Sequence, residues 1–484
     1  RLLAVHYGTG MAANACYTAR RIPRVFFDAV FASAIAACFI PAFTECLAKR
    51  GQKKAFQFAG SFITAITLVS ALLTVLGMLC AGPLVTLFAD GYDAPTAALA
   101  AELTRIMFPT VLFTGAAFSF VGILQSLGEF NVPAFISTVS NLVIILYFWT
   151  LNGRFGIWGL AGAFLLGWFL QAAVQVPALH RKGFRYRPGL DLRSHEMGQV
   201  LALMGPVMVS TWVQPINLTI NSKFGSRLYG GAGVSAIEYA TNLYLILAGV
   251  FVLSITNVIF PQLSRLSAGE EKGAFAAALR QTLRGTLFFV LPMSAGLMIL
   301  ARPLVSFLYG DGQFDAFSID ITSQSLFWVS LGMAGYAVQN IVSRAYFARQ
   351  QGKVPLLAGG ASILVNILLC AVLTEPFGVA GLAVSSAVSS TVYALLLLAP
   401  MQRRDRLLTP GLWAALGKML AATLAMSAAA LGTARLTDGL LGGKLGLLLT
   451  LGATALVGAA VYFGGALLLG LEELSVVKKL LKRG

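Results

Sequence analysis

"GPLVTLFADGYDA" at residues 82–94 and "RPLVSFLYGDGQFDA" at residues 302–316 are two versions of one pattern, an apolar Pro-Leu-Val turn followed by a Gly/Asp loop. Three more pairs recur in the same order, and all four pairs are separated by 220 or 222 residues. They are "FIPAF" at 39–43 with "IFPQL" at 259–263, "NVPAF" at 131–135 with "KVPLL" at 353–357, and "FGIWGLAG" at 155–162 with "FGVAGLAV" at 377–384. Short apolar matches arise by chance, but a shared spacing seldom does. We therefore predict two internal repeats.

The composition is that of a membrane protein. Of the 484 residues 57% are hydrophobic and 11% are charged, and the mean hydropathy is +0.80. Soluble domains carry about 25% charged residues, so the sequence predicts a polytopic membrane protein. The formal net charge is +16, but the basic residues form short clusters between apolar runs. This distribution follows the positive-inside rule and does not indicate a nucleic-acid partner.

Apolar runs long enough to cross a bilayer, which takes about 20 residues, occur thirteen times. They lie near 14–47, 55–89, 97–127, 132–151, 157–179, 199–224, 234–263, 276–308, 318–347, 355–373, 379–401, 410–434 and 445–471. We interpret the short apolar stretch before Gly8 as the end of one more helix whose start precedes Arg1. The predicted fold is therefore all-α with fourteen spans, the first truncated.

The repeat and the spans together predict the domain organisation. Residues 1–198 form an N-terminal lobe of spans 1–6, residues 199–406 a C-terminal lobe of spans 7–12, and residues 407–484 an extra helix pair with a basic cytoplasmic tail. An even number of helices per lobe makes the repeats parallel, related by an axis along the membrane normal. This is a transporter architecture, in which substrate binds between the lobes and access alternates. A duplicated membrane protein that does not transport is the alternative.

Lysine and arginine predict the orientation. Basic loops alternate with short loops that are poor in Lys and Arg, such as "ADGYDA" and "TEPFG". The basic side is cytoplasmic by the positive-inside rule, which places the C-terminus in the cytoplasm. The most basic segments are "HRKGFRYRPGLDLRSH" at 180–195 and "VVKKLLKRG" at 476–484. We interpret both as orientation signals, with the gathering of anionic lipid as the lesser alternative.

Three arginines and one aspartate lie in a predicted membrane helix, in "ARRIPRVFFDAVFASA" at 19–34. A charge facing lipid costs about 2.5–3.5 kcal/mol or more, so these side chains must face protein, water or ligand. Arg20, Arg24 and Asp28 are spaced i, i+4, i+8 and share one helix face, with Arg21 beside them. A guanidinium group grips phosphate oxygens bidentately. We predict an anion site at Arg24, Arg21 and Arg20, with Asp28 orienting one arginine. The alternative is that Arg20 and Arg21 snorkel to the interface and that Arg24 pairs structurally with Asp28.

Other polar residues inside the spans form pairs at i, i+4. The pairs are Asn217 with Asn221, Glu238 with Asn242, Asn340 with Arg344, and Ser362 with Asn366. Such pairs often hold membrane helices together, at about 0.6 kcal/mol each. The functional interpretation is that Asn217, Asn221, Asn242 and Arg344 line a substrate cavity.

No chemical motif indicates an enzyme or a cofactor. The five cysteines contain no CxxC pair, the three histidines are scattered, and no nucleophile–base pair, metal cluster or Walker motif occurs. We predict no metal, no cofactor and no intrinsic coupling to ATP.

Three stretches of the sequence resemble the MurJ/MviN lipid II flippases, within the multidrug/oligosaccharidyl-lipid/polysaccharide exporter superfamily. They are "GTGMAANACYTARRIPRVFFDAVFASAIAACFIPAF" at 8–43, "SRAYFARQQGKVP" at 343–355 and "GVAGLA" at 378–383. The helix pair after the twelfth span favours this family over multidrug exporters, which usually have twelve. The resemblance implies a bacterial inner-membrane protein that moves lipid II, the undecaprenyl-pyrophosphate-linked peptidoglycan precursor, to the outer leaflet. It further implies a cavity between the lobes for the headgroup and a groove for the lipid tail at the last helix pair.

The sequence also departs from the family. Many members have arginine where this chain has Phe27, and often where it has Asn242; Arg24, one turn before Phe27, could replace that charge. Another lipid-linked polysaccharide flippase, a drug/cation antiporter and a non-transporting scaffold remain as alternatives.

Coupling to protons, to sodium or to the membrane potential is possible. Asp28 and Glu238 are the proton candidates. Some relatives carry a cation site to which Asn221, Ser362 and Asn366 would be nearest. These three residues are neutral, whereas a cation site normally uses carboxylates, so we do not expect a tight sodium site.

Overall fold

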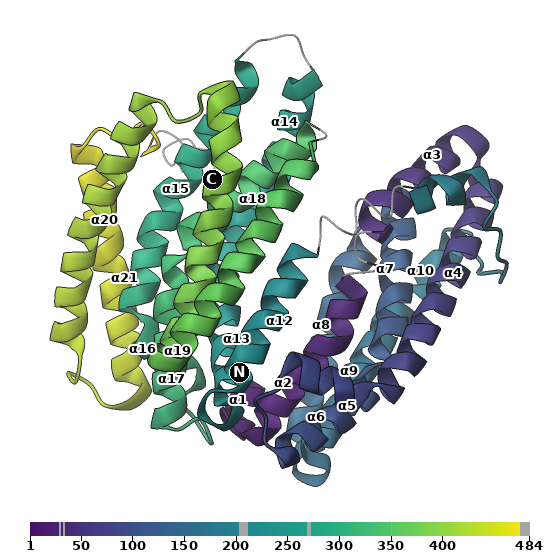
Figure 1. The fold of residues 1–484 in the computed structure, drawn as a ribbon, viewed down its shortest axis with the longest axis horizontal. Helices are drawn as coiled ribbons and strands as arrows, with labels where there is room; N and C mark the ends of the chain where they lie inside the picture. Colours follow the sequence, from purple (N-terminus) through teal and green to yellow (C-terminus); the bar gives the residue numbers. More distant parts are fainter. Residues whose placement is uncertain (29–30, 32–33, 203–211, 269–272, 350, 475–484) are drawn as a thin grey trace. The chain divides into compact units, whose positions relative to one another are not determined.

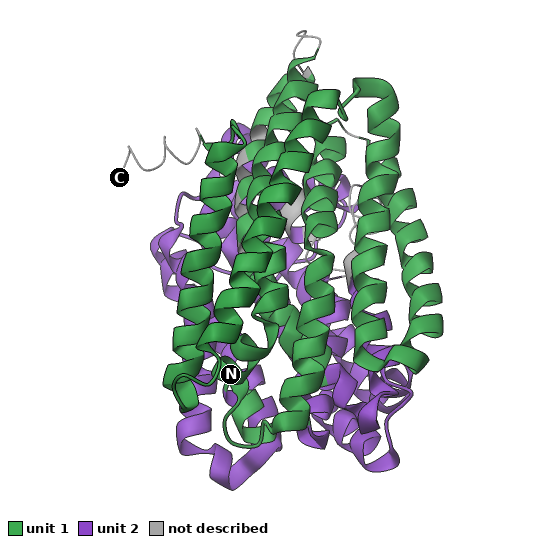
Figure 2. Cartoon of the chain, turned by 90° about the vertical axis from the view of Figure 1, so that its left-hand side faces the viewer, with its two compact units in different colours: residues 1, 3–9, 235–484 green, residues 2, 10–234 purple. Residues whose placement is uncertain are grey.

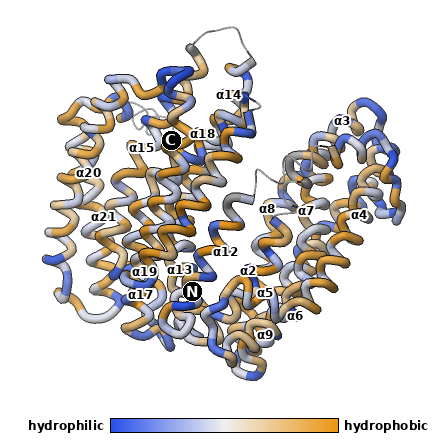
Figure 3. The backbone as a smooth tube through the Cα atoms, in the orientation of Figure 1, coloured by the Kyte–Doolittle hydropathy of each residue, from blue (hydrophilic) through white to orange (hydrophobic). Residues whose placement is uncertain are grey.

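The computed structural model describes residues 1–28, 31, 34–202, 212–268, 273–349 and 351–474. The described residues are largely helical and contain no strand (Figure 1). Eight of their helices are long and apolar enough to cross a membrane, and hydrophobic residues dominate these helices along their length (Figure 3). These findings confirm the predicted all-α polytopic fold, whereas the count of fourteen spans stays a prediction. The basic tail at 476–484 and residues 203–211 of the predicted span at 199–224 lie outside the described residues.

The chain forms two compact units, which Figure 2 distinguishes by colour. Unit 2 holds residues 2 and 10–234. Its helices are α2 (Met11–Phe27), η2 (Ala34–Phe39), α3 (Ile40–Arg50), α4 (Gln52–Leu79), α5 (Ala81–Phe88), α6 (Ala94–Met107), α7 (Thr110–Ser126), α8 (Asn131–Thr150), α9 (Asn152–Ala173), α10 (Val176–Arg181), α12 (Val213–Ser226) and η3 (Tyr229–Gly231). η2 is a π-helix, a rare form that recurs at functional sites.

Unit 1 holds residues 1, 3–9 and 235–484. Its helices are α1 (Leu2–Tyr7), α13 (Ala232–Tyr244), η4 (Leu245–Gly249), α14 (Val250–Ala268), α15 (Ala274–Ile299), α16 (Ala301–Tyr309), α17 (Ala316–Leu331), α18 (Met333–Ala348), α19 (Lys353–Asp405), α20 (Pro410–Thr437) and α21 (Gly443–Leu468). α20 and α21 lie side by side and pack on α15 (Figure 1). Phe288, Met419 and Tyr462 form part of this contact, and the Tyr462 hydroxyl donates to the Phe288 carbonyl.

Backbone features recur at the spacing of the sequence repeat. Gly156 and Gly378, 222 residues apart, adopt nearly the same conformation, with φ/ψ of 51°/−141° and 57°/−135°. Only glycine enters this region readily, and it kinks α9 and α19 at equivalent points. The carboxylates of Asp93 and Asp315, also 222 residues apart, accept the backbone N–H three residues on and cap α6 and α17.

The predicted spans at 55–89 and 276–308 are each two helices, which corrects the sequence analysis. The first helix ends at Leu79 or Ile299, and a short second helix follows as α5 or α16. Pro83 and Pro303 stand in the first turn of the second helix, where the missing N–H of proline costs no helical hydrogen bond. A break before each proline is therefore more stable than a continuous helix, in which the proline would remove a backbone hydrogen bond.

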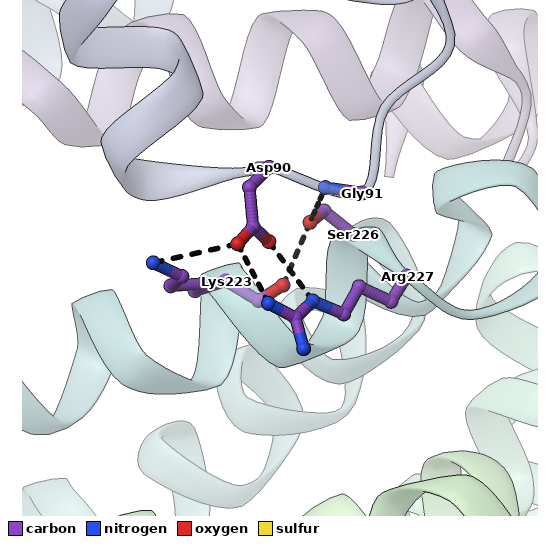
Figure 4. A network of polar contacts seen from close by, with 5 residues as sticks. All are labelled: Asp90, Gly91, Lys223, Ser226 and Arg227. Carbon is purple, nitrogen blue, oxygen red and sulfur yellow. Dashed lines mark hydrogen bonds and ion pairs between the residues drawn. The ribbon is translucent and has the colours of Figure 1, made fainter. Parts of the chain in front are cut away.

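An ion cluster joins the loop after α5 to the end of α12, within unit 2 (Figure 4). The Asp90 carboxylate accepts hydrogen bonds from Arg227 Nε at 3.0 Å and Nη2 at 2.6 Å, and Lys223 Nζ lies 3.4 Å away. The Gly91 N–H donates to Ser226 Oγ at 3.0 Å. The Arg227 guanidinium lowers the pKa of the Asp90 carboxyl by hydrogen bonding to its charged form.

A corresponding contact in unit 1 joins α1 to the loop before α17. The Gln313 N–H donates to the Val5 carbonyl at 2.9 Å, and the hydroxyls of Thr9 and Ser318 lie 2.8 Å apart. The loops involved, 89–93 and 310–315, are the two Gly/Asp loops of the sequence repeat. Each loop therefore fastens a helix that is distant in sequence.

Candidate functional site

A cavity of about 260 Å³ lies within unit 2, between α2, α7, α8 and α9. Its wall combines cationic, aromatic and neutral polar side chains. The lining residues are Arg20, Pro23, Arg24, Phe27, Asp28, Met107, Thr110, Val111, Thr114, Phe118, Ser140, Asn141, Ile144, Phe164, Trp168 and Gln171. An apolar wall with a few convergent polar groups is the usual make-up of a ligand site.

The charged side of the cavity comes from one face of α2, as the i, i+4, i+8 spacing predicted. Arg20, Arg24 and Asp28 all line the cavity. Arg24 Nε donates to Asp28 Oδ2 at 3.4 Å, with 75% and 35% of the two side chains exposed. The Arg20 guanidinium lies 5.2 Å from the ring centre of Tyr17 and 5.4 Å from that of Phe164, within the range of cation–π attraction. Arg20 thus packs against two aromatic rings, whereas the ion pair of Arg24 with Asp28 is long and exposed.

Arg21 takes a different position from its two neighbours. Its side chain is only 8% exposed, it is not among the residues lining the cavity, and its Nη1 donates to the Leu218 carbonyl on α12 at 3.0 Å. One residue along an α-helix turns the side chain by about 100°, so Arg21 cannot share the face of Arg20 and Arg24. The structure therefore does not bring Arg21 into the cavity, and it places Arg21 in a contact between α2 and α12.

Aromatic rings form another part of the cavity wall, with Phe27 on α2, Phe118 on α7, and Phe164 and Trp168 on α9. Phe27 is 5% exposed and packs against Phe118, with the ring centres 5.4 Å apart. Phe118 in turn lies 6.3 Å from the Trp168 ring. Such a wall makes part of the cavity apolar, whereas the Arg24 side chain itself is largely exposed. The wall also offers flat apolar surface to a sugar ring or an acyl group.

The neutral polar wall was missed in the sequence analysis. Gln171 is 6% exposed and its Nε2 donates to Ser140 Oγ at 2.8 Å, joining α9 to α8. Gln175 Nε2 donates to the carbonyls of Ala117 and Gln171. The signal for this wall was a pair of glutamines at i, i+4 inside the apolar run 157–179, the same pattern that selected the asparagine pairs.

The remaining candidates lie away from this cavity. Asn217 and Asn221 are half-buried on α12 in unit 2, Glu238 and Asn242 are half-buried on α13 in unit 1, and Arg344 is exposed on α18 with its guanidinium 5.8 Å from the Phe260 ring centre. None of these five residues lines the described cavity. Their proposed part in substrate binding or ion coupling stays a prediction.

Ser362 and Asn366 are buried within unit 1. Ser362 Oγ lies 2.9 Å from Ser389 Oγ and donates to the Ser389 carbonyl, across the kink of α19. The Cys370 thiol donates to Asn366 Oδ1 at 3.7 Å. Among the described residues, no group of three or more His, Cys, Asp or Glu side chains could hold a metal ion. The cluster joins the two halves of α19 through neutral groups.

The helices, the internal repeat and a cavity with two arginines together define a multi-pass membrane protein of the transporter type. Solved structures agree on the fold. The chain superposes on "Lipid II flippase MurJ, inward closed conformation" with a TM-score of 0.80 at 24% identity, covering 96% of this chain and 94% of that one. A multidrug resistance transporter of the MATE family, in an inward-facing conformation, gives a TM-score of 0.66 at 16% identity over 82% of this chain and 94% of its own.

Sequence comparisons identify the family. The family described as "Lipid II flippase MurJ" matches residues 3–450. The "Probable lipid II flippase MurJ" of Buchnera aphidicola subsp. Acyrthosiphon pisum is 29% identical over 83% of this chain and 80% of its own length. The "Lipid II flippase MurJ" of Burkholderia cenocepacia is 28% identical over the same shares. The chain belongs to the MurJ lipid II flippase family, as its sequence resemblance predicted.

Proposed function

We propose that this protein moves lipid II from the cytoplasmic to the outer leaflet of the bacterial inner membrane, where the precursor serves peptidoglycan synthesis. Lipid II is the substrate named for its relatives. The observation that assigns substrate binding to particular residues is the cavity in unit 2, which Arg20 and Arg24 line together with aromatic side chains.

The cavity suits the anionic part of a lipid-linked sugar. A pyrophosphate cannot cross hydrocarbon without cationic partners, and a guanidinium pairs with phosphate oxygens in a planar, bidentate way. Arg24 is the more available of the two arginines, because an exposed ion pair such as Arg24–Asp28 is worth at most about 1 kcal/mol. A phosphate can therefore displace Asp28 from Arg24 at little cost. Arg20, held between two rings, supplies a fixed second charge.

Alternating access of the two repeats would carry the loaded site across the membrane. Asp28 is the first candidate for coupling this step to protons, since losing its partner to phosphate would change its charge environment. Glu238 is the second proton candidate, and sodium or the membrane potential are other drivers. The basic loops favour a cytoplasmic C-terminus by the positive-inside rule, and surrounding membrane lipids are expected partners.

Complementation tests the proposal. The protein is expressed in a bacterium depleted of its own lipid II flippase, as wild type, Arg24→Ala, Arg24→Lys and Arg154→Ala. Arg154 is an exposed arginine of unit 2 outside the cavity lining, so it serves as the matched control. A charge-assisted hydrogen bond is worth about 1.5–3 kcal/mol, so we expect Arg24→Ala to lower flipping about 10- to 100-fold.

Growth should return with wild type and Arg154→Ala, return weakly with Arg24→Lys, and fail with Arg24→Ala at equal membrane abundance. Rescue by Arg24→Ala would support lipid II flipping as the function but contradict the assignment of the cavity as its binding site. No rescue by correctly inserted wild type would contradict the function itself and favour a polysaccharide-lipid or drug exporter, or a protein that does not transport.

A further inference from the structure

The segment between α10 and α12 begins with a basic loop, residues 182–194, that runs along α4 (Figure 1). Phe184 is buried and meets the Phe56 ring edge-on, with the ring centres 5.3 Å apart. The hydroxyls of Tyr186 and Thr64 lie 3.0 Å apart, and the Asp191 N–H donates to Ser61 Oγ at 3.4 Å. Contacts along the loop therefore dock it on the first turns of α4.

Both ends of the basic loop are also held by charges. Lys182 Nζ lies 3.8 Å from Glu129, and the Lys182 carbonyl accepts from Gln52 Nε2. Just past the other end, Arg50 Nη1 lies 2.8 Å from Glu196, whose side chain is 12% exposed. These contacts fix the loop as an ordered part of unit 2 with one face exposed.

That outer face carries both free charge and apolar surface. Arg185, Arg187 and Arg193 are exposed, and in the described part of the chain no carboxylate forms an ion pair with any of them. Leu190 and Leu192 lie between them in the sequence, 51% and 49% exposed. Arginine beside exposed leucine is the composition of an element that lies in a membrane interface.

The basic loop lies along the first half of α4, with contacts from Gln52 to Thr64. We infer that its exposed face meets the membrane interface at this basic end of α4. Lys53 and Lys54 at the start of α4 are exposed, and the helix turns hydrophilic there (Figure 3). An irregular backbone cannot lie exposed in hydrocarbon, because its N–H and C=O groups would stay unsatisfied. We therefore infer that the exposed backbone of the loop meets water or headgroups, and not acyl chains, at the basic end of α4.

We propose that the basic loop binds anionic phospholipid headgroups of the leaflet on its side of the membrane. Its arginines pair with phosphate groups, and Leu190 and Leu192 rest on the acyl–glycerol boundary. The contact adds a lipid-binding site to unit 2 outside the cavity that Arg20 and Arg24 line, and it stands whether or not the chain transports lipid II. Each basic residue near an anionic surface gains roughly fivefold in local affinity.

Hydrogen–deuterium exchange in nanodiscs tests this proposal. Wild type is compared in phosphatidylcholine discs and in discs that also contain phosphatidylglycerol, beside R185Q/R187Q and the control R403Q/R404Q. The control removes two exposed arginines from the end of α19. Amides 185–190 should exchange several-fold more slowly in the phosphatidylglycerol discs, for wild type and control alike. R185Q/R187Q should lose this difference while peptides of α4 keep their protection, which shows that the variant is folded.

Two results would overturn the proposal. One is equal exchange of the loop in the two kinds of disc, or an unchanged lipid effect in R185Q/R187Q. The other is protection that appears only when a cytosolic fraction is added to phosphatidylcholine discs, which would assign the loop to an acidic protein partner. A second variant, L190S/L192S, separates the apolar contribution, and it should reduce the lipid-dependent protection with both arginines intact.

Discussion

Replacing Asp90 by asparagine should loosen the loop after α5 from the end of α12. Asparagine keeps the size of the side chain and one oxygen acceptor, but it removes the charge that Arg227 and Lys223 face (Figure 4). The substitution therefore isolates the electrostatic part of the contact.

The magnitude follows from geometry and exposure. Arg227 makes two hydrogen bonds to Asp90, which alone would suggest about 1.5–3 kcal/mol. The side chains are 25% exposed for Asp90 and 51% for Arg227, however, and exposed pairs are worth only about 0.2–1 kcal/mol. We expect about 1 kcal/mol, equivalent to a roughly fivefold larger population of the open loop.

The Gly91 amide reports this opening directly, because its N–H donates to Ser226 Oγ. Its exchange rate is proportional to the population in which the loop has opened. D90N and R227Q should each accelerate this exchange about fivefold, and the double variant should be no faster than either single one. D438N is the control, since Asp438 is exposed in another loop and has no ion-pair partner in the described chain.

Two outcomes would refute this reasoning. Exchange at Gly91 that is the same in D90N and wild type would mean that the charge does not hold the loop. Exchange in the double variant equal to the product of the two single effects, about 25-fold, would mean that Asp90 and Arg227 act independently.

Three further predictions concern other parts of the fold. The hydrogen bond from Arg227 lowers the pKa of Asp90. The stabilisation of the loop by Asp90 should therefore be complete above the ordinary carboxyl pKa of about 3.9 and be lost as the pH falls through the lowered pKa. In that acidic range Gly91 exchange, corrected for the intrinsic rate, should rise in wild type and stay flat in D90N. Gly378→Ala should lower the thermal midpoint in detergent by several degrees, since alanine at this backbone conformation costs about 1–3 kcal/mol, whereas Gly360→Ala, at an open helical position of the same helix, should not. Arg349 and Asp405 form two hydrogen bonds with only 13% of each side chain exposed, so R349Q should cost about 3–5 kcal/mol and reduce the folded yield on size-exclusion chromatography, and R349Q/D405N should recover most of it.

The fold was largely predictable because lipid imposes a simple rule. Backbone groups in hydrocarbon must bond within their own helix, so long apolar runs predict helices without knowledge of their neighbours. The breaks at Cys80 and Leu300 were not predicted, since membrane helices tolerate glycine and proline and the apolar character continues through both breaks. The sequence repeat could have predicted these breaks, because Pro83 and Pro303 follow them at the same distance in the two repeats.

The candidate site was only half predictable. Helical periodicity placed Arg20, Arg24 and Asp28 on one face because that geometry is local to α2. The same periodicity, applied strictly, excludes Arg21 from that face. Another part of the wall, with Gln171 and Trp168, comes from a helix more than a hundred residues later, and no local pattern pairs these segments.

The contact between α1 and the loop before α17 has a consequence for biosynthesis. Thr9 and Ser318, whose hydroxyls meet, are separated by 309 positions in the chain. At about 5–20 residues per second, a ribosome needs roughly 15–60 s to supply the second partner after the first. During that time α1 stands in the membrane without the surface that later receives it. The contact at Thr9 is thus completed only after the intervening residues up to Ser318 have been made, and an insertion factor or chaperone would have α1 to protect for that interval.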